Sequence, residues 1–266
     1  MSTDLNTAAG QRRSDGSAGD ADYGRIGQGY ASYRQPEPAI AALIEEALGP
    51  ARCILNVGAG AGSYEPRHRD VTAIEPSASM RAQRPADIAV AIDGTAEKLP
   101  FPDQSFDASM ATFTVHQWQD LDAGLREMRR VTRGPVVILS CDPELVEAFW
   151  LNHYAPKVLA TEARRYPSLG HIGKVLGGDV EIVAVPIPLA CRDGFNEAYY
   201  GRPELFLEPG ARSACSAWSF VSEAENAASI AHLRDDLATG AWDCCYGFLR
   251  GQSSFEGSLR LVIARP

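Results

Sequence analysis

Three alternating glycines mark a candidate ligand-binding turn. Gly58, Gly60 and Gly62 follow the apolar run at residues 53–57 in the sequence ILNVGAGAGSYEP. Glycines let the backbone bend sharply and let a ligand approach it closely. The turn lacks the Lys-Ser or Lys-Thr pair of a phosphate-gripping P-loop, and Ser63 stands where a GxGxxG dinucleotide turn has its third glycine. The turn therefore predicts a nucleotide-type binding site whose glycine spacing matches neither of these two motifs.

A carboxylate follows the next apolar run. Glu75 comes seventeen residues after Gly58 and ends the run at residues 71–74. An acidic side chain at this place can accept hydrogen bonds from both hydroxyls of a ribose. Pro76 then leads into a short helix, on which Met80 is positioned to cover an adenine face. The alternative is a surface carboxylate at a strand end, and the upstream glycines favour the ribose interpretation.

Strand-like and helix-like segments must position these residues. The runs predicted as strands lie at residues 53–57, 71–74, 88–92, 106–113, 136–141, 181–186 and 258–264. Helices are expected at residues 36–50, 118–130 and 144–165, and from Ser222, which forms a capping box with Glu225. The alternation predicts an α/β fold, with a doubly wound, Rossmann-like sheet of seven mostly parallel strands and late cap insertions.

Composition excludes several classes of protein. The 266 residues carry a net charge of −9, and a protein that coats nucleic acid needs a basic face, so no nucleic-acid partner is expected. No run approaches about 18 apolar residues and the N-terminus has no apolar export signal, which predicts a cytoplasmic protein with no membrane partner. The six cysteines lack CxxC spacing and are expected as free thiols.

A third motif carries a family resemblance. Residues 92–109 read IDGTAEKLPFPDQSFDAS, in which a turn with Ala-Glu-x-Leu-Pro-Phe precedes Ser-Phe-Asp. With the glycine turn and Glu75, this run resembles the class I S-adenosylmethionine-dependent methyltransferases, in the group typified by ubiquinone and menaquinone methyltransferases (methyltransferase type 11). The resemblance covers residues 23–142 and the final strand.

The resemblance implies S-adenosyl-L-methionine as cofactor and assigns residues to its parts. Gly58, Ala59, Gly60 and Gly62 are expected beneath its methionine portion, and Tyr33 and Arg34 near its carboxylate. Glu75 is expected at the ribose, and Thr112 beside the transferable methyl group. The remaining residues implied as cofactor-binding are Asn56, Pro76, Met80, Thr95, Ala96 and Glu97. Asn56 stands where the family usually has an acid for the cofactor's amino group, and Thr95 where Asp commonly reaches the adenine amine.

The resemblance also implies a division of the chain. Residues 1–22 are polar and predicted as a disordered tail. The cofactor-binding core is expected from residues 23–143, 178–187 and 256–266. Residues 144–177 and 188–255 are expected as substrate cap insertions. Insertions late in an α/β sheet are suited to cover its active-site edge.

The expected reaction is methyl transfer to a small-molecule acceptor. The cofactor's sulfonium already activates the methyl group, so the protein must align a nucleophile and exclude water. His116, in the loop after the fourth strand, is a candidate general base, and packing against the next helix is its alternative role. Asp142 stands alone at its strand end, so no metal is predicted. No oligomeric state is predicted.

Two other functions stay open. Cys191, Cys244 and Cys245 allow a methyltransferase of arsenite or another thiol-type acceptor. The departures at Asn56 and Thr95 allow a non-catalytic S-adenosylmethionine-binding protein. A nicotinamide oxidoreductase is disfavoured by the glycine spacing and by the Ala-Glu-x-Leu-Pro-Phe turn.

Overall fold

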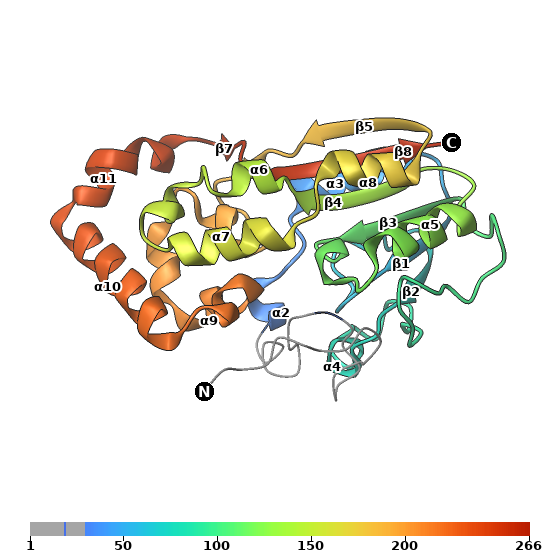
Figure 1. Ribbon diagram of the computed structural model, residues 1–266, viewed down its shortest axis with the longest axis horizontal. Helices are drawn as coiled ribbons and strands as arrows, with labels where there is room; N and C mark the ends of the chain where they lie inside the picture. Colours follow the sequence, from blue (N-terminus) through green and yellow to red (C-terminus); the bar gives the residue numbers. More distant parts are fainter. Residues whose placement is uncertain (1–18, 20–29) are drawn as a thin grey trace.

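The computed structural model describes residue 19 and residues 30–266, and the predicted tail at 1–22 therefore lies outside the described residues except for Gly19. A six-stranded sheet in the order β2-β1-β3-β4-β8-β5 forms the centre of the fold (Figure 1). Its strands are β1 (Cys53–Val57), β2 (Asp70–Ile74), β3 (Ala108–Thr112), β4 (Val136–Cys141), β5 (Asp179–Ala184) and β8 (Leu259–Arg265). The short strands β6 (Ile187–Pro188) and β7 (Ser254–Phe255) pair separately.

The first four strands of the sheet run parallel, and β8 is antiparallel to both of its neighbours. The helices are α2 (Tyr30–Tyr33), α3 (Pro38–Leu48), α4 (Ala78–Arg81), α5 (Leu121–Val131), α6 (Pro143–Val146), α7 (Pro156–Arg165), α8 (Leu169–Leu176), α9 (Pro209–Ser213), α10 (Glu223–Thr239) and α11 (Ala241–Tyr246). The 3₁₀ turns are η1 (Val115–Gln117), η2 (Trp150–His153), η3 (Asn196–Tyr199), η4 (Pro203–Leu207), η5 (Ser216–Phe220) and η6 (Gly247–Gly251).

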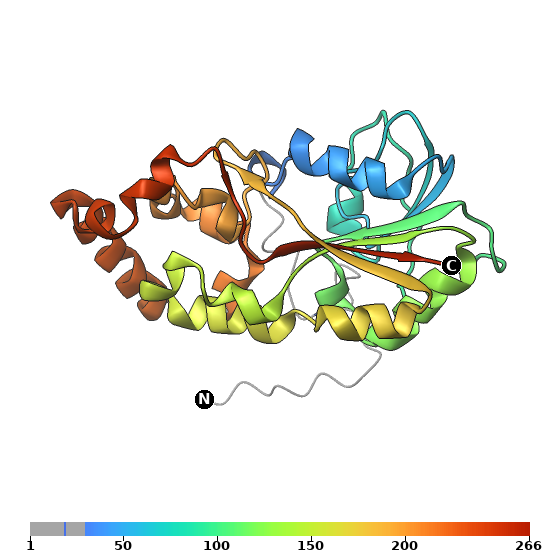
Figure 2. The same cartoon turned by 90° about the horizontal axis from the view of Figure 1, so that it is seen from above.

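Strand side chains alternate between two apolar layers. Ile54 and Met110 face the layer that contains α3, whereas Leu55 and Ala111 face the layer of α5 and α8. Figure 2 shows α3 on one side of the sheet and α5 with α8 on the other. Both faces of the central strands are therefore buried, as the nearly continuous apolar runs predicted. The segment predicted as one helix at 144–165 is divided among α6, η2 and α7.

Helix boundaries follow from local capping. The Glu37 carboxylate accepts a hydrogen bond from the Ala39 N–H before α3, and Gly49 ends this helix at φ 58°. Asp120 caps α5 through the Ala123 N–H. Ser222 caps α10 through the Glu225 N–H, which confirms the predicted helix start. Each cap satisfies an N–H that lacks a partner in the first helical turn.

The prediction of a strand at 88–92 is wrong, and the sheet has six strands. Only Ile92 bridges to β2, where its N–H donates to the Ala73 oxygen at 2.8 Å. A turn from Pro85 to Ile88 occupies the approach. Val90 is 90% exposed and Ile92 43%, and of residues 88–92 only Ala91 belongs to a core cluster. The strand predicted at 106–113 is also shorter, because Phe106 forms only an isolated bridge and Phe113 turns away at φ 53°.

A helical extension, made of residues 143–166 and 187–255, adjoins the sheet beyond β4, at the left of Figures 1 and 2. Its aromatic side chains fill its own interior: Trp150, Tyr200, Phe206, Trp218 and Trp242 are all buried. They belong to the same apolar cluster as Ile54 and Leu139, so the extension and one face of the sheet share a continuous core. By contrast, α8 packs against α5 and β8 in the opposite layer. Within the described residues, no helix combines the length and apolar character needed to span a bilayer.

Candidate functional site

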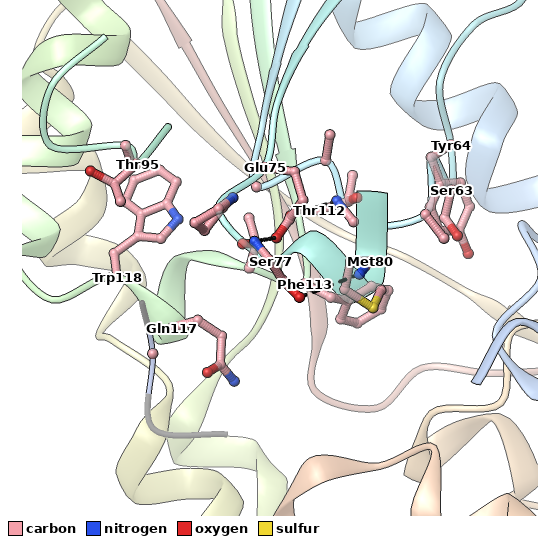
Figure 3. A pocket seen from close by; sticks show the side chains of 18 of the residues that line it. Ser63, Tyr64, Glu75, Ser77, Met80, Thr95, Thr112, Phe113, Gln117 and Trp118 are labelled. Atoms are coloured by element: carbon pink, nitrogen blue, oxygen red, sulfur yellow. Dashed lines mark hydrogen bonds between the residues drawn. The ribbon is translucent and has the colours of Figure 1, made fainter. Parts of the chain in front are cut away.

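A cavity of about 900 Å³ opens at the carboxyl ends of β1, β2 and β3. Ligands of open α/β sheets bind at this edge. In Figure 3, Thr95 and Trp118 lie at one end of the cavity, and Ser63 and Tyr64 at the other. Glu75, Ser77 and Thr112 lie between the two ends. The cavity is therefore elongated across the tips of three strands.

The glycine turn forms the floor of this cavity. Gly58 has φ 70°, and a Cβ there would lie 2.1 Å from Thr114 Oγ1. Gly62 has φ 93°, and its Cβ would meet Ile88 Cδ1 at 2.2 Å. The N–H groups of Gly58 and Ala59 both donate to the Ile74 oxygen at 2.9 Å, which anchors the turn to the end of β2. Side chains at Gly58 or Gly62 would therefore displace the turn.

Glu75 lies beside this floor with its carboxylate already oriented. One oxygen accepts the Gly60 N–H at 2.8 Å, and the other accepts the Ser77 N–H at 2.8 Å. Burial raises the pKa of this carboxyl, while the two N–H donors oppose the shift. Each oxygen keeps a further lone pair, so the carboxylate can accept two hydroxyl donors at once. This geometry fits a ribose.

Asn56 is directed away from the cavity. It is fully buried, and its Nδ2 donates to Glu65 Oε1 at 2.9 Å. Glu65 in turn forms a buried ion pair with Arg84 at 2.8 Å, and Arg84 Nη1 donates to the Gly60 oxygen. A carboxylate at position 56 would repel Glu65, so the pair with Arg84 explains the amide at this position. The three side chains support the glycine turn from below.

Arg34 and Asp193 close the end of the cavity near Tyr64. The Arg34 guanidinium donates to Asp193 Oδ1 at 2.5 Å, and the Tyr64 hydroxyl donates to Asp193 Oδ2 at 2.8 Å. The buried carboxylate raises the pKa of Tyr64, together with desolvation. Arg34 also lies over the Phe113 ring, 4.9 Å from its centroid. A charged residue of the late chain thus completes the cavity.

The structure brings most of the predicted cofactor residues to one wall. Those that line the cavity are Arg34, Gly58, Ala59, Gly60, Glu75, Pro76, Met80, Thr95, Ala96, Glu97 and Thr112. Tyr33, Asn56 and Gly62 do not line it. Tyr33 packs near Gly210 and donates to Glu208, and Gly62 acts through the turn. Glu97 also accepts the Gln119 N–H at 2.9 Å, which ties it to the start of α5.

Several lining residues were missed by the sequence reasoning. They are Gly19, Ala61, Ser63, Tyr64, Ser77, Phe113, Thr114, Gln117, Trp118 and Asp193. Phe113, Thr114, Gln117 and Trp118 follow a predicted strand end, and this position in the sequence could have identified them as lining residues. Asp193 has no motif around it, and only the fold brings it to the cavity.

A second cavity of about 480 Å³ adjoins the first and shares Arg34 and Phe113 with it. Its other lining residues are His116, Glu162, Arg165, Tyr166, Phe195, Ala214, Cys215, Ser216 and Ala217. His116 thus lines the second cavity. Burial and the charges of Arg165 and Arg34 hold the pKa of His116 well below its usual value. The two cavities together offer a place for a cofactor and a place for a second molecule.

The fold and the first cavity define a Rossmann-like protein that binds a nucleoside-type cofactor. Residues 55–138 match the family described as "Methyltransferase domain". The chain is 29% identical over 115 residues to the Bacillus subtilis methyltransferase YcgJ, covering 39% of this chain and 42% of that protein. It is 34% identical over 131 residues to malonyl-[acyl-carrier protein] O-methyltransferase of Erwinia pyrifoliae, covering 45% and 49%.

A solved structure from Anabaena variabilis, named as a methyltransferase from an antibiotic biosynthesis pathway, is 27% identical and has a TM-score of 0.81. The match covers 88% of this chain and 99% of that one. A Haemonchus contortus phosphoethanolamine N-methyltransferase, solved with S-adenosylhomocysteine, shares the fold at 14% identity and a TM-score of 0.53, covering 91% and 56%.

Residues 55–138 form a methyltransferase domain, and these matches support a class I S-adenosylmethionine-dependent methyltransferase. Its cofactor is S-adenosyl-L-methionine. The chain spans less than half the length of the curated relatives named above.

Proposed function

We propose that this protein transfers the methyl group of S-adenosylmethionine to a small-molecule acceptor. The observation that carries the proposal is the convergence of Glu75, the glycine turn and the Thr95–Glu97 motif on one elongated cavity. A cofactor with a nucleoside and an amino-acid portion needs such a cavity, with a ribose acceptor in the middle. The family match supports the same reaction.

The residues of the first cavity have distinct roles in the proposal. Glu75 accepts the ribose hydroxyls, and Thr95, Ala96 and Met80 surround the adenine. Arg34, paired with Asp193, lies where a carboxylate can contact it. The bound cofactor supplies a methyl group on a sulfonium, which needs no further activation. The protein then has to orient an acceptor and exclude water.

The late insertions are proposed as the acceptor side of the site. Residues 188–255 contribute Asp193 to the first cavity, and Phe195, Cys215 and Ala217 to the second. The relatives named above are a methyltransferase of malonyl-[acyl-carrier protein], one from an antibiotic biosynthesis pathway and one of phosphoethanolamine. These acceptors differ from one another, so the acceptor of this chain has to be inferred from its own second cavity.

No observation favours the two alternative functions over the proposed one. Cys191 is buried with its Sγ near the Asp193 oxygen, and Cys244 and Cys245 are exposed on α11. Figures 1 and 2 place α11 at the end of the molecule opposite to β2. Among the described residues, no group of three or more His, Cys, Asp or Glu side chains could hold a metal ion.

Calorimetric titration with S-adenosylhomocysteine tests the proposal, and NADH serves as the control ligand. We expect micromolar binding of S-adenosylhomocysteine and none of NADH. Glu75→Gln should weaken S-adenosylhomocysteine about 10-fold to 100-fold, because a hydrogen bond to a charged group contributes about 1.5–3 kcal/mol. Glu181→Gln is a matched control on β5, far from the cavity. Binding of NADH alone, or of neither ligand, contradicts the proposal.

A further inference from the structure

The second cavity contains a carboxyl group that the cofactor does not need. Glu162, on α7, lines this cavity but not the first one. Its residue is partly exposed, and desolvation is the main cause that raises the pKa of its carboxyl group. Asn196 Nδ2 donates to Glu162 Oε2 at 2.6 Å and fixes the side chain. The other carboxylate oxygen is available to accept a proton or a hydrogen bond from a molecule in the cavity.

The charges around this cavity restrict what it can bind. Among the described lining residues, the charged side chains are Arg34, Arg165 and Glu162. Arg34 is balanced by Asp193, and Arg165 donates to Ser216 and lies over the Phe220 ring. A cationic acceptor would meet two guanidinium groups, and the cofactor's sulfonium as well. An anionic acceptor would meet the Glu162 carboxylate. The cavity therefore suits a neutral molecule.

The remaining wall of the second cavity is aromatic. The Phe113 and Phe195 rings lie 5.2 Å apart, and the His116 ring meets the Tyr166 ring edge to face at 4.7 Å. The small residues Ala214, Cys215, Ser216 and Ala217 complete the lining. Aromatic rings beside polar groups favour a planar ligand that carries a protic group.

Resting on the proposed methyl-transfer function, we propose that the second cavity binds a neutral, planar acceptor with a phenolic or enolic hydroxyl, and that Glu162 removes its proton. The hydroxyl oxygen forms the new bond to the methyl carbon while the carbon–sulfur bond of the cofactor breaks. The products are the methyl ether, S-adenosylhomocysteine and protonated Glu162. Phe113, shared by both cavities, is the wall at which the two reactants meet.

Glu162 suits this role better than His116. A general base works best with a pKa near the operating pH, which an elevated carboxyl pKa approaches and a strongly lowered imidazole pKa does not. His116 instead packs against Tyr166. The titratable and charged groups that surround Glu162 are Arg34, Arg165, Tyr166, Cys141, Cys215 and Glu197.

The test uses acceptors that share a ring system and differ only in the nucleophile. The full chain is given labelled S-adenosylmethionine with phenol, benzylamine, benzoate or thiophenol, and with the four corresponding naphthalene compounds. We expect transfer to a hydroxyl compound with a kcat/KM at least about 10-fold above the others. Preferential transfer to the amine, carboxylate or thiol overturns the proposal. So does S-adenosylhomocysteine binding without transfer to either hydroxyl compound, whereas failure of S-adenosylhomocysteine to bind overturns the methyltransferase function itself.

Two glutamate variants, one of Glu162 and one control, then separate a catalytic role from a structural one. Glu162→Gln should lower kcat at pH 7 about 100-fold or more without changing S-adenosylhomocysteine affinity. The rate should recover as the pH approaches about 10, where the phenol ionises without a base. Glu181→Gln, an exposed acid on β5 that lines neither cavity, should keep the wild-type rate. An unchanged rate in Glu162→Gln, or a loss that persists at high pH, overturns the proposal.

Discussion

The sheet half and the helical extension build their parts of the site in different ways. In the sheet half, residues 58–61 and 75–77 follow strand ends, and residues 95–97 follow the isolated bridge at Ile92; each of these runs enters the cavity as consecutive residues. In the extension, Glu162, Asp193, Phe195 and Cys215 enter singly and from separate segments. Cofactor contacts can therefore be recognised as motifs, whereas acceptor contacts depend on the packing of distant segments.

The same contrast holds for the polar side chains that hold each half together. Glu65 and Arg84, which support the glycine turn, are nineteen residues apart, whereas Arg34 and Asp193 are 159 residues apart. Yet one apolar cluster extends from Ile54 in β1 to Trp242 in α11. The two halves differ in how their sites are encoded, but they share a core.

The largest expected effect tests whether the halves unfold together. Phe206 is fully buried in the extension and contacts the rings of Trp150, Tyr199 and Trp218. Phe206→Ala should cost about 4 kcal/mol through lost burial and the cavity left behind. Because the core is continuous, calorimetry should record one transition at a lower Tm. Two transitions, with a lowered Tm in only one of them, would show that the two halves unfold independently.

Glu197 connects the halves and makes their association depend on pH. Its carboxylate accepts the Ser258 N–H at 2.8 Å and the Ser258 hydroxyl at 2.8 Å, next to the start of β8. Burial raises its pKa from 4.5 to about 7. Between these values the unfolded chain releases a proton that the folded protein keeps, so stability falls as the pH rises, by about 3 kcal/mol.

Urea unfolding at a series of pH values measures this dependence. Glu197→Gln should flatten the decline in the free energy of unfolding between pH 4.5 and 7. The control is Glu181→Gln on β5, which is exposed and should leave the profile unchanged. An equal slope in the wild type and Glu197→Gln would refute the assignment.

A pair of glycines compares the ligand turn with an ordinary helix end. Gly58 and Gly49 both have positive φ, but only a Cβ at Gly58 meets a neighbour. Gly58→Ala should lower S-adenosylhomocysteine affinity about 100-fold, equivalent to about 2.7 kcal/mol. Gly49→Ala should cost about 1 kcal/mol of stability through backbone strain and leave the affinity unchanged. Similar affinities for the two variants would mean that the turn tolerates displacement.

Asn56 provides the smallest effect. Asn56→Asp places a second carboxylate at the position where the amide now donates to Glu65. One of the two acids must then keep a proton, which raises its pKa and should cost about 2 kcal/mol of stability near pH 8. The loss should shrink as the pH falls towards about 3.5, where that acid is largely protonated in the unfolded chain as well. Thermal unfolding at both pH values checks it, and a loss of equal size at each would contradict the charge explanation.

Local patterns predicted most of the sheet and one wall of the site. β1, β2 and β4 carry apolar runs bounded by turn residues. The capping box of Ser222 and Glu225 predicts the start of α10. The run at 88–92 has the same appearance, but it fails because Val90 finds no packing partner. An apolar run becomes a strand only where both neighbours and a covering layer exist, and a linear pattern does not contain that information.

The cavity walls divide in the same way. Glu75 could be predicted because a loop and the single strand β2 separate it from Gly58. Asn56 was expected at the cofactor, but its direction depends on the Glu65–Arg84 pair, which has no separate signal. Asp193 and Glu162 follow from tertiary packing alone. The domain boundaries and the individual cofactor contacts remain predictions to be tested by binding.

The bridge between Arg34 and Asp193 has a kinetic consequence. Closing a loop of 159 residues has a large entropic cost, so contacts of this span form late, after the local turns of the sheet half. The end of the cavity is then absent from the folding transition state. A ligand that needs this end should slow unfolding and leave the folding rate unchanged. Its bound lifetime would also be limited by how often the extension separates locally from residues 33–34.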